Sequence, residues 1–379
     1  MIIKNGLTFT ENGRFEPLSI LAKQGRITGV LAADEAARAD GEMVDASGCY
    51  VLPGLMDVHV HGCAGHDFCD GKADSLEKMA EHLFSQGVTA FCPATMTLPE
   101  ETLEGILRNA AVWKKRQEGC AGLQTRAELM GIHLEGPFLN PAKRGAQRED
   151  WLKMPSVELL QKWQDAAEGL IRIVTLAPEL DGAMDCMERL RGLFHFSVGH
   201  SESDYETARR AFQAGADHVT HLFNAMTPFT HREPGIVGAA FDDGKCYAEL
   251  ICDGIHVDPS VVRMAFQLFG EDRVVLISDG MEATGMPDGE YQLGGQRVSL
   301  KGKRATLSDG TLAGSASTLY DCLKKAVEYG IPLESAIKAA TVNPARSIGA
   351  DDEYGSIKVG KRARFLLLDQ RNLSIVRVI

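Results

Sequence analysis

Two histidines that could bind one metal ion lie in the stretch "VLPGLMDVHVHGCAGHDF", residues 51–68. His59 and His61 are two residues apart at the end of an apolar run. Side chains two apart on a β-strand point to the same face, so both imidazoles could reach the same ion. Histidines can also alternate by chance on a surface, and a single histidine in an apolar run is more often a hydrogen-bonded core residue. The pair therefore needs further candidate ligands before it indicates a metal site.

Other polar side chains support a metal site because they also occur at the ends of apolar runs. They are Glu135, His200, His256 and Asp279, at or near the ends of their runs, and His221, which the predicted strand at residues 218–225 carries. Imidazole nitrogen and carboxylate oxygen, without a thiolate, suit Zn²⁺, Fe²⁺ and similar divalent ions. A catalytic ion lowers the pKa of a bound water, and an aspartate beside that water can act as general base and then as general acid. This set of residues predicts metal-dependent hydrolysis.

The apolar runs that carry these residues alternate with helix-like segments after Pro53. Eight strand-like runs are present, at residues 54–60, 88–96, 129–136, 171–179, 196–201, 218–225, 247–256 and 273–280. An eightfold alternation of strand and helix predicts an α/β fold, a (β/α)8 TIM-like barrel, with its active site at the carboxyl ends of the strands. The candidate ligands are then expected at one end of the barrel.

The chain on either side of the predicted barrel has β character. Residues 1–53 contain short strand-like pieces separated by Gly and Asn turns, and residues 350–379 return to this pattern. We expect these two segments to form one small β-sandwich domain, and residues 54–349 to form the barrel. Residues 289–314 interrupt the alternation of strand and helix, which predicts a β-hairpin inserted after the eighth strand.

Composition narrows the class of protein and of ligand. The chain of 379 residues has a formal net charge of −12 and a pI near 5.4, which disfavours general binding to nucleic acid or to anionic membranes. Nine scattered cysteines without a CxxC pair fit a reducing compartment. Neither a secretory signal nor an apolar run of membrane-spanning length is visible. We expect a cytoplasmic protein that binds an anionic ligand only through a local basic site.

Several phrases of the sequence resemble a known family. "LPGLMDVHVHG", "TVNPARSIG" and "GSIKVGKRARFLLLD" are similar to segments of the metal-dependent amidohydrolases. "GIHLEGPFLN", "VGHS", "HLFNAM", "REPGIVGA", "DGIHVDP" and "ISDGMEATG" resemble the N-acetylglucosamine-6-phosphate deacetylases within them. The resemblance implies hydrolysis of the acetamide of N-acetylglucosamine 6-phosphate to glucosamine 6-phosphate and acetate, in amino-sugar catabolism or cell-wall recycling.

The resemblance also implies roles for the candidate ligands. Glu135, His200 and His221 resemble the metal site that the family shares. His59 and His61 resemble a second site that only some members keep, so one or two ions, Zn or Fe, are expected per subunit. Glu135 would bridge two ions. Asp279 resembles the catalytic base and acid, and would also touch the metal at the histidine pair.

A sugar-phosphate site follows from the same resemblance. Arg232 and His256 resemble the residues that hold the phosphate, and Asn224 and Ala225 resemble its backbone contacts. In the family a neighbouring subunit completes this site, which implies a homodimer. Lys143 and Arg144 could help to attract the phosphate, although solvated surface charge is the simpler interpretation of both.

One position departs from the family pattern, and other functions stay open. Gln147 stands in "RGAQRED" where the family often has a histidine that polarises the acetyl carbonyl. Glutamine can donate a hydrogen bond to that oxygen but cannot titrate. The motifs do not separate the glucosamine substrate from its galactosamine epimer. Another amide hydrolase of the superfamily, or a scaffold protein on an inactive barrel, are the remaining alternatives, although the ligand set is complete and no strand-four lysine ligand is evident.

Overall fold

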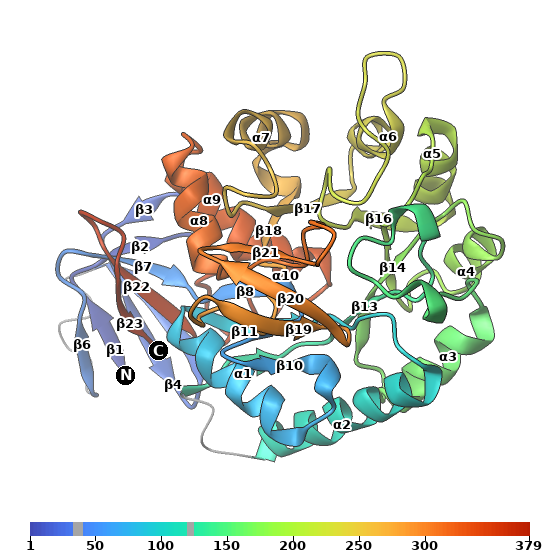
Figure 1. The fold of residues 1–379 in the computed structure, drawn as a ribbon. Coiled ribbons are helices and arrows are strands. Elements are labelled where there is room, and N and C mark those ends of the chain that lie inside the picture. Colours follow the sequence, from blue (N-terminus) through green and yellow to red (C-terminus); the bar gives the residue numbers. More distant parts are fainter. Residues whose placement is uncertain (33–40, 120–124) are drawn as a thin grey trace.

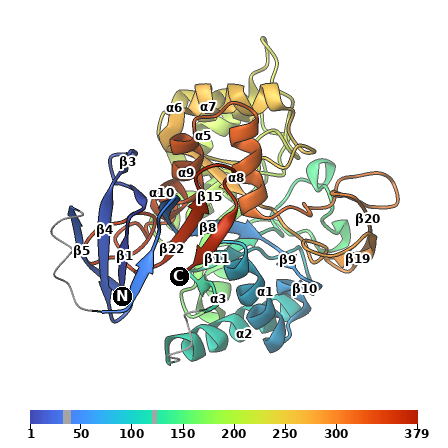
Figure 2. The same cartoon turned by 90° about the vertical axis from the view of Figure 1, so that its left-hand side faces the viewer.

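The computed structural model describes residues 1–32, 41–119 and 125–379, so residues 33–40 of the predicted N-terminal β segment lie outside the described residues. The chain has an α/β fold in which helices surround a curled parallel sheet (Figure 1). Strands from both ends of the chain lie together beside it (Figure 2). The helices are α1 (Ala73–Ser85), α2 (Glu100–Gly119), α3 (Val157–Ala166), α4 (Ala183–Arg189), α5 (Tyr205–Ala214), α6 (Gly235–Asp243), α7 (Pro259–Arg273), α8 (Leu319–Glu328), α9 (Leu333–Ala340) and α10 (Val342–Ser347).

The parallel strands form one sheet in the order β12-β11-β8 and a second sheet that runs from β13 to β18 in sequence order. Isolated parallel bridges join Val60 of β8 to Gly280 and Ala94, which directly follows β11, to His133 of β13, so the two sheets lie side by side. The strands are β8 (Leu55–Val60), β11 (Val88–Pro93), β12 (Glu128–Leu129), β13 (Ile132–Glu135), β14 (Ile171–Leu176), β15 (His195–Val198), β16 (Ala216–Val219), β17 (Tyr247–Ile251) and β18 (Val274–Ile277).

Burial explains why these apolar runs form strands flanked by helices. Every residue of β8 and β11 is buried, as expected for parallel strands that are covered on both faces. The flanking helices are amphipathic. In α5 the side chain of Asp204 caps the first turn, and Ala208, Ala211 and Phe212 form the buried face. No helix among the described residues is long and apolar enough to cross a lipid bilayer.

Several candidate ligands lie beyond the strands that were expected to contain them. The prediction that strand six carries His221 is wrong, because β16 ends at Val219. His256 likewise lies in the loop after β17 and not at its end. His200, His221 and Asp279 have φ angles of 49°, 30° and 48°. A side chain other than glycine rarely adopts this left-handed conformation, which ends extended pairing and occurs often at functional sites.

Strands from both termini pair within one region. One sheet has the order β5-β4-β1-β6 and the other β23-β22-β7-β2-β3. Strand β22 runs antiparallel to β7, from Phe365 opposite Pro53 to Asp369 opposite Cys49. A buried apolar cluster contains side chains of both sheets. The strands are β1 (Ile2–Lys4), β2 (Leu7–Phe9), β3 (Phe15–Glu16), β4 (Leu18–Lys23), β5 (Arg26–Ala32), β6 (Met43–Asp45), β7 (Cys49–Pro53), β22 (Phe365–Asp369) and β23 (Ile375–Val378).

The segment that follows the last parallel strand has three strands where a single hairpin was expected. They are β19 (Gly289–Leu293), β20 (Gln296–Lys301) and β21 (Arg304–Thr306), all antiparallel. The Gln296 side chain donates a hydrogen bond to the carbonyl oxygen of Ala146, 2.5 Å away. This contact joins the insertion to the loop that carries Gln147.

A buried ion pair connects the terminal strands to the parallel sheet, and its loss should destabilise the protein. Arg364 Nη2 lies 2.9 Å from Glu128 Oε1, and the two side chains are only 10% and 5% exposed. The Arg364→Met substitution leaves the buried Glu128 carboxylate without its cation, with only the hydroxyl of Tyr354 still donating to it. We therefore expect the free energy of unfolding to fall by about 3 kcal/mol. Urea unfolding measures this change.

The control for this substitution is Lys358→Met, which removes an exposed pair with Glu11. We expect it to change the free energy of unfolding by less than about 1 kcal/mol. Equal effects of the two substitutions would contradict a structural role for the buried pair.

Candidate metal centre and active site

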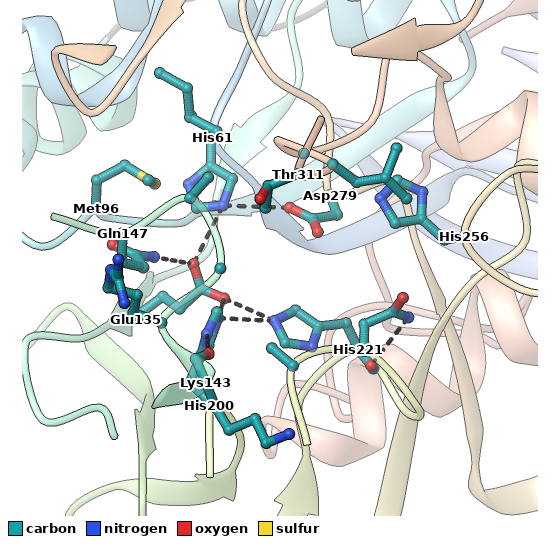
Figure 3. Close-up of a pocket in the computed structure, with 18 of the residues that line it drawn as sticks. His61, Met96, Glu135, Lys143, Gln147, His200, His221, His256, Asp279 and Thr311 are labelled. Atoms are coloured by element: carbon teal, nitrogen blue, oxygen red, sulfur yellow. Dashed lines mark hydrogen bonds and ion pairs between the residues drawn. The ribbon is translucent and has the colours of Figure 1, made fainter. Parts of the chain in front are cut away.

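The carboxyl ends of the parallel strands surround a cavity of about 470 Å³. Most of the predicted site residues line it, and Figure 3 shows several of them converging on Glu135. Those that line it are His61, Glu135, Gln147, His200, His221, Asn224, Ala225, His256 and Asp279. His59 lies behind this layer and is fully buried. Arg232 is exposed and is not among the residues that line the cavity.

Glu135, His200 and His221 form one compact group of possible ligands. The Nε2 atoms of both histidines lie 3.1 Å from Glu135 Oε1 and 3.0 Å from each other. A separation of 3.0 Å between these nitrogens fits a single N–H···N hydrogen bond when one ring carries a proton at Nε2, and it also suits two nitrogens that bind the same cation. Ligand atoms about 3 Å apart suit an ion with bonds of about 2.0–2.2 Å.

His59, His61 and Asp279 form a second group beside the first. Asp279 Oδ1 lies 3.2 Å from His61 Nε2 and 3.7 Å from His59 Nε2. Glu135 reaches this group as well, because its Oε2 lies 3.3 Å from His61 Nε2 and its Oε1 lies 3.5 Å from His59 Nε2. Glu135 therefore contacts both groups of ligands.

In three of the imidazole rings a hydrogen bond at Nδ1 leaves Nε2 as the nitrogen that could bind a metal ion. Nδ1 of His61 lies 3.2 Å from the carbonyl oxygen of Ala94, and Nδ1 of His200 lies 2.8 Å from that of Lys143. A carbonyl oxygen only accepts, so each Nδ1 carries a proton and each Nε2 is free to bind a cation. Nδ1 of His59 is held in the same way by the carboxylate of Glu249, at 3.0 Å. His59 Nε2 is buried and has no hydrogen-bond partner.

The buried carboxylates and imidazoles of the site shift one another's pKa values. Burial alone lowers the pKa of His59, but the charges of Glu135, Asp279 and Glu249 outweigh it and raise that pKa to about 9. The pKa of His61 is also raised well above its usual value, because bonds to Asp279 and Glu135 outweigh burial. Burial raises the pKa of Asp279, whereas His59 and His61 lower it to about 2. Protons on the two imidazoles thus balance the carboxylates where an ion could do so.

Of the remaining predicted residues, Gln147 and His256 lie at the cavity and Arg232 lies on the surface. Gln147 is buried; its Oε1 accepts from the Thr97 backbone N–H at 2.6 Å, and its Nε2 donates to Glu135 Oε2 at 2.8 Å. His256 faces the cavity and its Nδ1 contacts Asp253 at 2.7 Å. Arg232 lies on the exposed segment before α6, which protrudes from the molecule in Figure 1.

Sequence reasoning missed a buried layer behind the metal ligands. Glu249 lies on β17 and contacts His59, although neither it nor its strand was considered a source of a supporting residue. Its signal was a single charge within the apolar run "YAELI". His133 belongs to the same layer: its ring lies edge-on to that of His59 with centroids 4.4 Å apart, and burial lowers its pKa to about 3. The insertion also supplies cavity residues that were not predicted, including Leu293 and Thr311.

Metal binding at these imidazoles should release protons. His59 and His61 are protonated near neutral pH in the metal-free protein, so an ion at Nε2 must displace those protons. We expect the apparent affinity for Zn²⁺ to rise with pH up to the pKa of His59, because proton competition weakens over that range. Calorimetry in buffers of different ionisation enthalpy counts the protons released. His59→Gln should release fewer, and the absence of proton release from the wild-type chain would contradict the assignment.

Comparison with known proteins identifies the family of the chain. The model of the amidohydrolase family matches residues 50–379. The N-acetylglucosamine-6-phosphate deacetylase of Bacillus subtilis (strain 168) is 37% identical over 370 residues, 97% of this chain and 93% of its own. The N-acetylgalactosamine-6-phosphate deacetylase of Escherichia coli O157:H7 is 37% identical over 343 residues, 90% of this chain and 89% of its own.

Solved structures are similar over the whole chain. A mutant N-acetyl-D-glucosamine-6-phosphate deacetylase from Mycobacterium smegmatis, in complex with N-acetyl-D-glucosamine-6-phosphate, has a TM-score of 0.90 and 33% identity, covering 100% of this chain and 97% of its own. The deacetylase from Pasteurella multocida has a TM-score of 0.92 and 27% identity with the same coverage. The chain therefore belongs to the amidohydrolase family, within the group that contains the N-acetylglucosamine-6-phosphate deacetylases.

Proposed function

We propose that the protein is a metal-dependent hydrolase that converts N-acetylglucosamine 6-phosphate and water to glucosamine 6-phosphate and acetate. One observation carries this proposal: Asp279 lies at the cavity, 3.2 Å from His61 Nε2, beside the cluster of Glu135, His200 and His221. A general base next to a cation site is what hydrolysis of an unactivated amide requires. The relatives that act on this substrate match almost the full chain.

The cofactor of the proposed reaction is Zn²⁺ or Fe²⁺, with one or two ions per subunit. Glu135, His200 and His221 would hold one ion, and His59, His61 and Asp279 would hold a second, with Glu135 shared between them. Supporting this, Glu135 contacts imidazoles of both groups, and the donors are nitrogen and oxygen. When bound, the metal supplies an activated water and polarises the acetamide carbonyl.

Asp279 carries the proton of the proposed reaction. An aspartate carboxylate is ordinarily ionised at neutral pH, so Asp279 can accept the proton of the attacking water. Water oxygen bonds to the acetyl carbon, and the carbon–nitrogen bond then breaks. Asp279 returns the proton to the departing amine nitrogen. Acetate and the amino sugar leave, and the carboxylate is ready for another cycle.

Gln147 has the position of the family's frequent histidine and is proposed to donate a hydrogen bond to the acetamide oxygen. The Thr97 backbone N–H fixes its Oε1, which turns the amide NH₂ group toward Glu135 and the cavity. One N–H bonds to Glu135, so the other is left for the substrate. A neutral donor stabilises a developing oxyanion without taking part in proton transfer.

The phosphate of the substrate is proposed to bind His256, Arg232 and the backbone at Asn224 and Ala225. His256, Asn224 and Ala225 line the cavity, whereas Arg232 is exposed and forms no ion pair with the described residues of its own chain. An arginine that lies outside its own cavity is free to reach the cavity of a neighbouring chain. This placement supports a homodimer whose phosphate sites are completed across the interface.

We extend the proposal to the closure of the barrel, the terminal domain and the cellular compartment. Residues 54–349 would form a closed (β/α)8 barrel with the insertion at 289–314, which the isolated bridges at its sheet edges support. Residues 1–53 and 350–379 would form a β-sandwich domain, in keeping with the pairing of β7 with β22. Cytoplasmic amino-sugar catabolism or cell-wall recycling is the proposed setting, and the cysteines of the described residues are all unpaired.

The galactosamine epimer is the alternative substrate, because a relative that acts on N-acetylgalactosamine 6-phosphate is 37% identical to this chain. Both reactions would use the same metal ligands and the same base. A scaffold protein on an inactive barrel is less consistent with the site, since inactive members lose ligands and both groups of ligands are complete here.

Replacing the proposed base should stop turnover without removing the metal. Asp279→Asn cannot accept a proton, so we expect kcat for N-acetylglucosamine 6-phosphate to fall by at least about a hundredfold, with the ion held by Glu135, His200 and His221 retained. Acetate release and elemental analysis measure the two effects. The matched control is Asp217→Asn, on the strand that precedes His221 and outside the cavity lining. Turnover by Asp279→Asn at the wild-type rate would exclude it as the base.

The two epimers should be separated by parallel assays. We expect the higher kcat/KM with N-acetylglucosamine 6-phosphate, because most relatives with high similarity are named for that substrate. Amine release from each sugar phosphate, at equal metal loading, gives the ratio. A higher kcat/KM with the galactosamine epimer would assign the chain to the alternative reaction.

A further inference from the structure

We propose that Glu249 is a positioning residue that fixes the orientation of His59 and thereby controls ion binding at the His59–His61–Asp279 group. Glu249 is fully buried on β17 and does not line the cavity. It therefore reaches neither the substrate nor the ion directly, and can act only through the residues it holds. The inference rests on the proposed function, because it assigns a control point within that metal centre.

The hydrogen bond between Glu249 and His59 determines which imidazole nitrogen faces the ligand cluster. Glu249 Oε2 lies 3.0 Å from His59 Nδ1. A carboxylate accepts, so Nδ1 must donate, and Nε2 is the nitrogen directed at Glu135 Oε1 and Asp279 Oδ1, 3.5 and 3.7 Å away. Nε2 has no hydrogen-bond partner there. Without Glu249 the ring would have no acceptor for Nδ1, and the opposite orientation or protonation would become available to it.

Glu249 also supports the other group of ligands through the backbone. The backbone N–H of His221 points at Glu249 Oε2 from 3.4 Å, and the N–H of Leu222 donates to the Glu249 carbonyl oxygen at 2.7 Å. These contacts hold the turn in which His221 has a φ of 30°. One residue thus touches the side chain of a ligand from one group and the backbone of a ligand from the other.

An ion held directly by Glu249, His59 and His133 is the competing interpretation, since these three also lie close together. The hydrogen bonds of His133 argue against it. Its Nδ1 lies 3.2 Å from the carbonyl oxygen of Val58 and its Nε2 lies 2.7 Å from Thr175 Oγ1, so neither nitrogen is free. Glu249 Oε1 lies 3.7 Å from His133 Nδ1, beyond hydrogen-bond distance. Glu249 and His133 therefore act by packing against His59, on the side of its ring away from the cavity, and not as ligands of a separate ion.

The test measures Zn²⁺ and Co²⁺ binding to metal-free protein, independently of catalysis. We expect two ions per wild-type chain. Glu249→Leu should bind one ion about 10–100-fold more weakly, as is typical when a supporting partner of a ligand is lost. It should weaken the other ion much less, because the substitution removes only the 3.4 Å contact with the His221 N–H and keeps the backbone hydrogen bond from Leu222 to residue 249. The Co²⁺ absorption spectrum of Glu249→Leu should resemble that of His59→Gln, which removes the ligand itself.

If Glu249→Leu does not fold, the conservative variant Glu249→Gln still tests the proposal. Its amide oxygen can still accept from His59 Nδ1, so we expect a smaller loss than in Glu249→Leu and retention of the slowly exchanging Nδ1 proton of His59 in NMR spectra of Zn²⁺-loaded protein. In the His59→Gln background, Glu249→Gln should leave the affinity for the remaining ion unchanged, because the imidazole that it positions is absent and its amide oxygen can still accept from the backbone N–H of His221.

Three results would overturn the inference. Unchanged binding of two ions by Glu249→Leu would show that His59 needs no support, and equal weakening of both ions would assign Glu249 a general structural role. A wild-type chain that binds only one ion would remove the second site but leave the proposed function intact. A wild-type chain that binds neither metal would overturn the proposed function as well, so the two failures are distinguishable.

Discussion

The Glu135 carboxylate lies 3.1 Å from His200 and His221 and within 3.5 Å of His59 and His61, in the interior of the protein. A buried carboxylate needs compensating partners, and four imidazoles from the ends of three strands supply them here. Protons on His59 and His61 can compensate its charge, and a bound divalent ion would do the same. The arrangement of the cavity follows from this one group, because the imidazoles of both ligand groups lie around it.

The fold must bring ligands from several strands to one carboxylate, that of Glu135. The ligands are far apart in the sequence, and only a curled parallel sheet brings the carboxyl ends of so many strands together. Left-handed backbone at His200, His221 and Asp279 turns the chain out of its strand at the level of the site. The antiparallel insertion closes one side of the cavity and contacts the loop of Gln147. On the side away from the cavity, Glu249 contacts the imidazole of His59 and the backbone N–H of His221.

Sequence patterns predicted the parts of the site that follow from strand geometry. The spacing of His59 and His61 and the end of the run at Glu135 needed only alternation and strand length. The supporting role of Glu249 could not be predicted, because a lone carboxylate in an apolar run does not reveal which side chain of a distant strand it faces. The positions of His221 and His256 beyond their strands depend on loop backbone conformation. The exposure of Arg232 likewise depends on the path of a loop, which apolar periodicity does not encode.

The most direct test of the proposed metal centre is anomalous diffraction from crystals of the Asp279→Asn protein soaked with N-acetylglucosamine 6-phosphate, recorded at the zinc and iron edges. We expect an anomalous peak among Glu135, His200 and His221, with the acetamide carbonyl of the sugar next to it and the substituted side chain at position 279 facing the scissile bond. A metal-replete crystal with no peak at these three residues, or with the acetamide bound away from the ion, would contradict the assignment of this cluster as the catalytic centre.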